Sequence, residues 1–346
     1  MAFQDREALN AKLRAIEMEL SSALAAINDV ENKFAYIDEA VASLSSRLAT
    51  VRGRGYAAMG HLEKSLDLIK NRWMEVSPAL KQDFYSTVQP LSVQIRGLQA
   101  EVKRLRSGFG GVLGWASIGT LSAEASTLRA RVSAETARIN VSLNDFLGSI
   151  NAIDRDLKIA EKTVELFSFA SFALKPDESP VLAIEGKIMG KEKCDGTLYF
   201  TNQRFIFEGK REVVLEKKLF IATKKRTERT VLMEQPIGAL QEILKGRVGL
   251  VAWTGIYIRF KPGLGLEETP FDVKDWEADV VTRFFQYIIG GEADRDIAKI
   301  KGITPKEAPT IRVIRCPNCG APYTKELYKG QTSVKCEYCG ASIMIS

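Results

Sequence analysis

A heptad repeat of apolar residues in the first fifty positions constrains the fold of this chain more than any other feature. From Leu9 to Val51, apolar side chains recur in alternating steps of four and three residues. The positions are Leu9, Leu13, Ile16, Leu20, Ala23, Ile27, Val30, Phe34, Ile37, Val41, Leu44, Leu48 and Val51. Because a repeat of about 3.5 residues keeps one stripe of a helix facing a partner, the pattern predicts a long coiled-coil helix.

Two further helical patterns follow, and with the first they predict a helical rod over residues 1–174. Apolar residues repeat from Leu62 to Leu105 and again from Leu121 to Phe167. Pro90 lacks an amide donor, which predicts a kink or short break in the middle helix. Similar lengths and short joints favour an antiparallel three-helix bundle. The alternative is a helical hairpin completed by a second chain, which would make the protein a homo-oligomer.

The joint between the second and third helical segments, residues 107–120, is unusually apolar for a loop. Its large apolar residues are Phe109, Val112, Leu113, Trp115 and Ile118. Apolar side chains clustered at a bundle tip beside basic residues indicate shallow insertion into a membrane or a socket for a partner. The alternative is that they fold back and cap the bundle.

The helical period stops at residues 175–180, and short segments typical of strands follow. Strands are predicted at 181–189, 196–200, 205–207, 213–223, 229–235, 239–245, 248–260 and 270–273, with an amphipathic helix at 275–288. A series of strands followed by one helix predicts a β-sandwich or a partly closed barrel plugged by that helix.

Two stretches within this region resemble a known family. Residues 196–208, GTLYFTNQRFIFE, resemble the strand-turn-strand signature of GRAM and pleckstrin-homology-like (PH-like) domains. Residues 235–243, QPIGALQEI, resemble a later strand of these domains. The resemblance covers residues 178–290. It implies a PH-like β-barrel with a closing C-terminal helix, which binds lipid headgroups, phosphoinositides or protein partners without catalysis.

Basic residues are concentrated within this region. The whole chain has a formal net charge of +6, whereas residues 210–229 alone contain eight basic and three acidic residues. The basic residues are Lys210, Arg211, Lys217, Lys218, Lys224, Lys225, Arg226 and Arg229. If Lys224, Lys225 and Arg226 form the tip of a hairpin, their charges converge there and predict non-specific attraction to an anionic membrane surface. The alternative is a solvated hairpin whose lysines protect a sheet edge.

A linker is expected at residues 291–311. It leads to the most specific motif of the sequence, a pair of CxxC knuckles in residues 312–346. The cysteines are Cys316, Cys319, Cys336 and Cys339. Four thiolates at this spacing predict a structural Zn²⁺ site, since closed coordination leaves no position for a catalytic water. Iron in a rubredoxin-like site is the alternative. The segment resembles zinc ribbons of the CPxCGA type, which bind nucleic acid in some families and proteins in others. We favour a protein partner.

The sequence offers no evident catalytic constellation. His61 is the only histidine, and its position indicates a residue on or beside the second helical seam. The Asp-Arg-Asp triplets at 154–156 and 294–296 place neighbouring carboxylates on different faces, so we interpret both as solvated surface. The start of the chain is charged, and no apolar run is long enough to span a bilayer, which predicts a cytoplasmic protein.

We therefore expect a non-enzymatic scaffold or tether. In this hypothesis the PH-like module binds either the inner face of an anionic membrane or a protein partner. The zinc ribbon docks a further partner. The alternative is a nucleic-acid-associated factor that uses the ribbon as reader and the coiled coil as dimeriser.

Overall fold

A computed structural model describes residues 2–107, 113–190, 193–218, 221–249, 253–298, 315–321, 323 and 327–345. Its contacts divide the chain into two compact units, each built from separate stretches of sequence. Residues 1–46 and 65–154 form what we call the helical unit, and residues 47–64 and 155–346 form the sheet unit.

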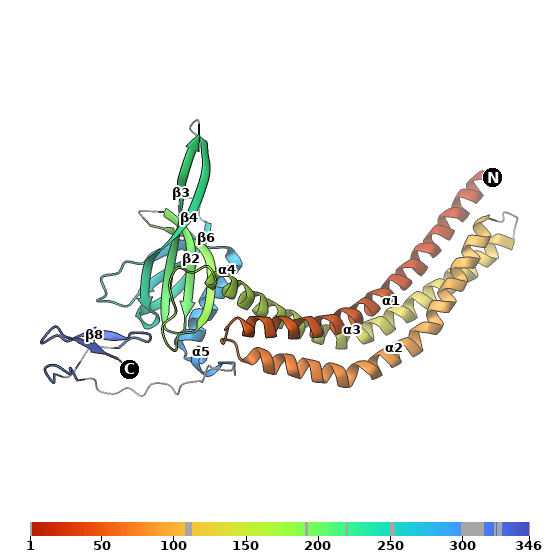
Figure 1. The fold of residues 1–346 in the computed structure, drawn as a ribbon. Coiled ribbons are helices and arrows are strands. Elements are labelled where there is room, and N and C mark those ends of the chain that lie inside the picture. Colours follow the sequence, from red (N-terminus) through yellow and green to blue (C-terminus); the bar gives the residue numbers. More distant parts are fainter. Residues whose placement is uncertain are drawn as a thin grey trace. The chain divides into compact units, whose positions relative to one another are not determined.

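Three long helices provide the helical unit: α1 (Ala2–Gly53), α2 (His61–Ser107) and α3 (Leu113–Phe167). Contacts between α1 and α2 run in opposite sequence directions, because Glu17 lies beside Arg106 and Asp38 beside Lys81. Contacts between α1 and α3 run in the same sequence direction. Glu19 of α1 bonds to Ser126 of α3, and the later residue Lys33 bonds to the later residue Asn140. The helices are therefore antiparallel in succession, as expected for an up-down-up bundle (Figure 1).

The heptad positions of the first helix are buried within this single chain. From Leu13 to Val51, every predicted seam residue of α1 is at most 8% exposed. The centre of the unit is aromatic: the ring of Trp73 lies 6.2 Å from Phe34 and 4.9 Å from Phe146, and Phe84 lies 5.8 Å from Phe34. Each helix contributes to this cluster, so the third helix of the bundle is supplied from within the chain.

Of the kink or short break predicted in the middle helix, the break is not observed. α2 continues through both Pro78 and Pro90. A proline inside a helix removes one hydrogen bond and costs about 3 kcal/mol. On either side of Pro90, Val88 and Leu91 are 2% and 1% exposed, so burial of the apolar seam outweighs the local cost.

Seven antiparallel strands form one sheet in the order β4-β3-β2-β1-β7-β6-β5. The strands are β1 (Pro180–Met189), β2 (Lys193–Thr201), β3 (Arg204–Lys218), β4 (Ile221–Pro236), β5 (Leu240–Val248), β6 (Trp253–Phe260) and β7 (Thr269–Asp272). The predicted segments 205–207 and 213–223 are not separate strands: β3 runs from 204 to 218, and β4 begins at 221.

The expected barrel is not closed in the described part of the chain, where β4 and β5 are the two edges of the sheet. Pro236 ends β4 and has no N–H to donate. The next N–H groups, of Ile237 and Gly238, donate to the carbonyls of Gln203 and Lys329. The backbone that connects β4 to β5 is therefore hydrogen-bonded to residues outside these two edge strands.

The β3–β4 hairpin is longer than the rest of the sheet. β2 pairs with β3 only as far as Gly209, whereas β3 and β4 remain paired out to Lys218 and Ile221. Residues 210–218 and 221–229 therefore form a two-stranded ribbon beyond the sheet (Figure 1), which we call the basic ribbon.

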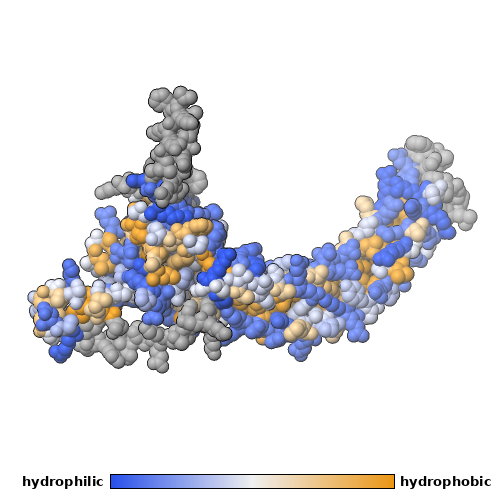
Figure 2. Space-filling model, viewed as in Figure 1, coloured by the Kyte–Doolittle hydropathy of each residue, from blue (hydrophilic) through white to orange (hydrophobic). Residues whose placement is uncertain are grey.

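The predicted closing helix is confirmed as α4 (Asp275–Ile289), which contacts β1, β5 and β6. A short helix, α5 (Glu292–Arg295), follows, and near the C-terminus β8 (Ser333–Lys335) pairs with β9 (Ser342–Met344). None of the helices in the described residues combines the length and apolarity needed to cross a bilayer. On the face shown in Figure 2, hydrophilic residues are interspersed with hydrophobic ones over the helices.

Candidate functional sites

Four cysteine side chains meet at the C-terminal end of the sheet unit. The Sγ atoms of Cys316, Cys319, Cys336 and Cys339 all lie within 4.8 Å of one another. The distance is 3.6 Å between Cys316 and Cys339 and 3.5 Å between Cys319 and Cys336. A tetrahedral metal with bonds of about 2.3 Å to sulfur requires such a spacing. The predicted ligands are therefore brought together, and this cluster could hold a metal ion.

The two knuckles have the same backbone geometry. In the first, Cys316 N–H donates to Ala321 O and Gly320 N–H donates to Cys316 O. The second knuckle repeats both bonds with residues twenty positions later. Gly320 and Gly340 have φ values of +76° and +72°, a region that disfavours side chains, so glycine is needed to complete each turn.

The thiols differ in their tendency to ionise. The backbone N–H of Ala341 and then the Asn318 amide lower the pKa of Cys339 to about 6. The N–H of Ala321 favours the Cys319 thiolate, but desolvation and the neighbouring sulfurs outweigh it and raise that pKa to about 12. Four neighbouring thiolates need a cation between them, which fits a metal centre.

The structure places the predicted anionic-surface residues on the basic ribbon, where some are paired. Lys210 Nζ lies 2.7 Å from Glu185, and Arg229 lies 3.3 Å from the buried carboxylate of Glu208. Arg211 is exposed. The others, Lys217, Lys218, Lys224, Lys225 and Arg226, lie on the ribbon strands, with side chains outside the described part.

The apolar joint between α2 and α3 is shorter than the sequence suggested, because α3 begins at Leu113. Ile118 is only 2% exposed, so this member of the expected tip belongs to the bundle core. Leu113 and Trp115 lie in the first turns of α3 with side chains outside the described part, and Phe109 and Val112 are outside the described residues.

A second site, which the sequence reasoning missed, surrounds the turn between α1 and α2. Tyr56 is fully buried and its hydroxyl donates to Val181 O at 2.9 Å. The N–H of Met59 donates to the hydroxyl of Tyr287 on α4. The Arg52 guanidinium donates to three carbonyls of this turn, including that of Tyr56. The turn is thus bound to both the sheet and the closing helix.

The segment after α5 completes this second site. Gly60 N–H donates to Asp296 O, and Ala298 N–H donates to Ala57 O, both at 2.8 Å. A Cβ at Gly60 would lie 2.9 Å from Ala298 N, so only glycine permits this approach of two backbones.

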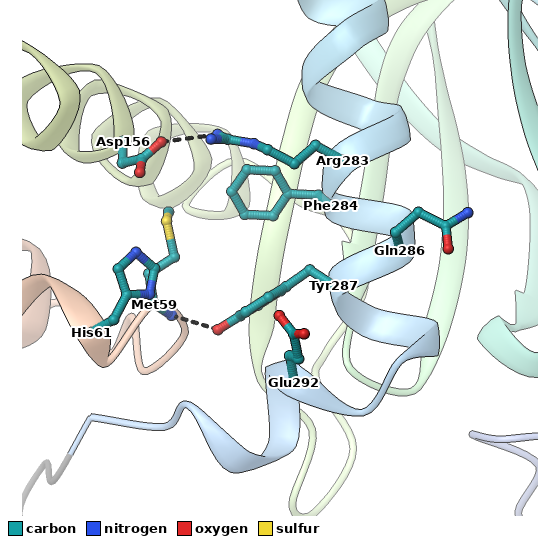
Figure 3. A pocket seen from close by; sticks show the side chains of 8 residues that line it. All are labelled: Met59, His61, Asp156, Arg283, Phe284, Gln286, Tyr287 and Glu292. Atoms are coloured by element: carbon teal, nitrogen blue, oxygen red, sulfur yellow. Dashed lines mark hydrogen bonds and ion pairs between the residues drawn. The ribbon is translucent and has the colours of Figure 1, made fainter.

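A pocket of about 300 Å³ opens beside this turn, lined by Met59, His61, Asp156, Arg283, Phe284, Gln286, Tyr287 and Glu292 (Figure 3). Several of its polar side chains already bond within the chain. Arg283 lies 2.9 Å from Asp156, and Tyr287 bonds to Asp296 at 3.1 Å. These pairs make the pocket part of a junction between helices.

His61 is the centre of this junction, and its environment corrects our interpretation of the two Asp-Arg-Asp triplets. His61 Nδ1 lies 2.5 Å from Asp296 Oδ2. Hydrogen bonds to Asp156 and then to Asp296 raise the pKa of His61 above its ordinary 6.5, although partial burial acts in the opposite direction. Burial also opposes ionisation of Asp156, but bonds from His61 and Arg283 outweigh it and lower its pKa. One carboxylate of each triplet therefore lies near the single histidine: Asp296 bonds to it, and Asp156 lines the same pocket. Separations of 95 and 235 residues along the chain could not reveal this.

Buried charged networks fix the chain between α3 and the sheet. Arg204 bonds through Nε and Nη2 to both oxygens of Glu178, at 2.7 and 2.5 Å. Glu208 is inaccessible to solvent and accepts bonds from Ser171 and Tyr199. Burial, and next the Glu208 charge, raise the pKa of Tyr199 to about 12.

Comparison with known proteins gives only distant similarities. No family model matches the chain, and no curated protein matches it. Among solved structures, the Vps36 N-terminal PH domain is 14% identical, with 34% of this chain and 86% of that chain covered and a TM-score of 0.23.

Other similar structures contain DH/PH domains. Those of p115-RhoGEF are 11% identical, covering 83% of this chain and 90% of that chain, with a TM-score of 0.26. The DH/PH domains of PDZ-RhoGEF, in complex with activated RhoA, are 10% identical, covering 81% and 94%, with a TM-score of 0.28.

These similarities also correct the prediction that the chain is not an enzyme. Exchange factors of the RhoGEF type are among the similar structures, so the absence of catalytic activity does not stand as a conclusion. TM-scores below 0.3 carry no activity over to this chain.

Proposed function

We propose that this protein is a scaffold or tether whose sheet domain, a PH-like module of the GRAM type, binds an anionic membrane surface through the basic ribbon. The observation that supports this is the extension of β3 and β4 past the sheet, with eight basic and three acidic residues in 210–229. A cationic element that projects beyond its domain can approach a flat surface. Each Lys or Arg near an anionic membrane contributes about 1 kcal/mol.

Not all of this charge is available for binding. Glu185 and Glu208 compensate Lys210 and Arg229 at the base of the ribbon. Lys217, Lys218, Lys224, Lys225 and Arg226 are farther from the sheet in the strand register. We therefore assign the attraction to the outer half of the ribbon and place the protein at the cytoplasmic face of a membrane.

The four-cysteine centre is proposed to hold a structural Zn²⁺, with Cys316, Cys319, Cys336 and Cys339 as its ligands. Zinc suits four sulfur ligands in a closed site, and iron is the competing metal. Its role is to fold a segment with a small apolar core, in which Val334 and Ile343 pack beside two of the cysteines. The folded ribbon would dock a further protein partner.

The test is cosedimentation of the full-length, zinc-loaded protein with vesicles of phosphatidylcholine alone or with phosphatidylserine. We compare the wild type with the variant Lys224→Glu, Lys225→Glu and Arg226→Glu. A matched control changes three exposed basic residues of the long helices α2 and α3, Lys64, Arg129 and Arg131, to Glu. Each triple change removes six charge units and takes the formal net charge from +6 to zero.

We expect salt-sensitive binding to the anionic vesicles that the ribbon variant loses and the control retains. Equal loss in both variants would show that net charge alone drives binding, and would contradict a role for the ribbon. If the wild type binds neither vesicle, the membrane is excluded as its target. Nucleic-acid binding that disappears on removal of residues 312–346 would instead support the nucleic-acid-associated alternative.

A further inference from the structure

The geometry around His61 points to a proton-dependent latch: we propose that the charged imidazolium fastens the segment at residues 290–298 to the start of α2. The latch lies entirely in the sheet unit and does not depend on the proposed membrane function. The segment that it holds leads to the connection with the four-cysteine centre.

The histidine lies near two carboxylates that come from different elements. His61 is the first residue of α2, Asp156 lies in α3, and Asp296 follows α5. His61 Nδ1 lies 2.5 Å from Asp296 Oδ2, and Asp156 lines the same pocket (Figure 3). A charged imidazolium can donate from both ring nitrogens, whereas the neutral ring donates from only one. The neutral ring can keep one hydrogen bond to Asp296 Oδ2, but it lacks the positive charge that attracts the carboxylates of Asp296 and Asp156.

Acidic groups around His61 favour its charged form. A positive charge at a helix N-terminus is opposed by the helix dipole, and the acidic groups offset this opposition. The groups facing it are Asp156 from α3, Arg283 and Tyr287 from α4, Glu292 from α5, and Asp296. Arg283 is paired with Asp156, which leaves the balance around the imidazole negative.

The latch holds Asp296, the residue that follows α5. Asp296 accepts a backbone bond from Gly60 and side-chain bonds from His61 and Tyr287. It therefore connects α5 to both α2 and α4. When His61 becomes neutral, the Asp296 carboxylate loses its cationic partner, and we expect the 290–298 segment to open more often.

The direction of the pH dependence follows from the sign of the shift. The pKa of His61 is raised in the folded protein, so its contribution is complete below about pH 6.5 and is lost as the pH rises through the folded-state value. His61 is about half exposed, so the effect is local.

The chain has a single histidine, which makes the titration directly observable. The ε1 carbon of His61 would be followed by NMR in full-length protein carrying ¹³C-labelled histidine. The wild type is compared with Asp156→Asn, with Asp296→Asn, and with Asp67→Asn as the control on an exposed part of α2. We expect a wild-type pKa above 6.5 that both junction substitutions lower and the control leaves unchanged.

The opening itself is measured by hydrogen exchange of peptides covering 54–64 and 290–298, between about pH 6 and pH 9, with protection corrected for intrinsic exchange. Wild-type protection should fall by about two- to fivefold across the titration, the scale of a partly exposed ion pair. In His61→Gln it should be low and independent of pH. A histidine that titrates at or below 6.5, or wild-type protection that does not change with pH, would overturn the latch.

Discussion

Arg204 and Glu178 form a bidentate ion pair from which solvent is almost fully excluded. Their side chains are 5% and 0% exposed, and the shorter of the two bonds is 2.5 Å. Thr201 donates a further bond to Glu178, and Arg204 also reaches Glu234. The pair joins the segment after α3 to the turn between β2 and β3.

Removal of one partner should destabilise the sheet unit strongly. Arg204→Met leaves the Glu178 carboxylate buried without its cation, which costs about 3–5 kcal/mol. Denaturant unfolding followed by tryptophan fluorescence and circular dichroism would measure the loss. Arg259→Met removes an exposed arginine of the same sheet and should change stability little. Equal effects of the two substitutions would show that burial of the Arg204 pair is not what matters.

The same pair predicts a loss of stability in acid. Burial opposes ionisation of Glu178, but bonds from Arg204, the Lys175 N–H and Thr201 outweigh it and lower its pKa below the ordinary 4.5. A lowered folded-state pKa stabilises the fold above about pH 4.5, and this contribution disappears as the pH falls through the folded value. Glu178→Gln should be less stable at neutral pH and should depend less on pH between about 3 and 5. If this variant loses stability in acid as steeply as the wild type, another carboxylate is responsible.

The aromatic centre of the bundle should carry much of the stability of the helical unit. Trp73→Ala removes a side chain that is 4% exposed and contacts rings from α1 and α3, so we expect a cost of about 3–5 kcal/mol. Met74→Ala, at the neighbouring position, alters a side chain that is 57% exposed and should have little effect. Thermal unfolding of both variants would compare them.

Two glycines of α2 and its preceding turn should respond with opposite signs. Gly60→Ala forces a methyl group against the backbone of residues 296–298 and should cost about 1–3 kcal/mol. Gly97→Ala lies in open space within α2, where alanine should stabilise by about 0.5–1 kcal/mol. Stabilisation by both substitutions would contradict the close docking of the turn.

Metal removal should unfold the C-terminal segment and leave the rest of the fold intact. Cys336→Ser should abolish stoichiometric metal binding, measured by elemental analysis, because three thiolates do not close the site. Cys194→Ser changes a cysteine outside the cluster and should retain one metal ion per chain. Loss of metal in both variants would indicate a different ligand set.

Periodicity predicted the elements of this fold well because burial follows it closely. The sequence predicted the α1 seam, the closing helix and the four-cysteine cluster, because each depends on residues with a fixed local spacing. The short break allowed for at Pro90 does not occur, because packing that spans three helices outweighs the local propensity.

The junction around His61 could not be predicted, because it depends on contacts between residues far apart in sequence. Nothing near His61 in the sequence distinguishes it from a seam residue, and Asp156 and Asp296 have the composition of ordinary surface. The one available signal was the combination of Gly60 and the buried aromatic Tyr56 in a short turn. Small and large residues side by side indicate a turn that packs closely against another segment.

The burial of Tyr56 also determines the order in which the protein can be completed during synthesis. Its hydroxyl needs Val181 as acceptor, and Met59 needs Tyr287, so a ribosome must first make most of the chain. The helices of the helical unit can pair as soon as they emerge, because all their partners lie before residue 155. Until residues 296–298 have been made, a nascent chain presents the backbone of Ala57 and Gly60 without its partners, and chaperones or proteases can recognise this state as unfinished.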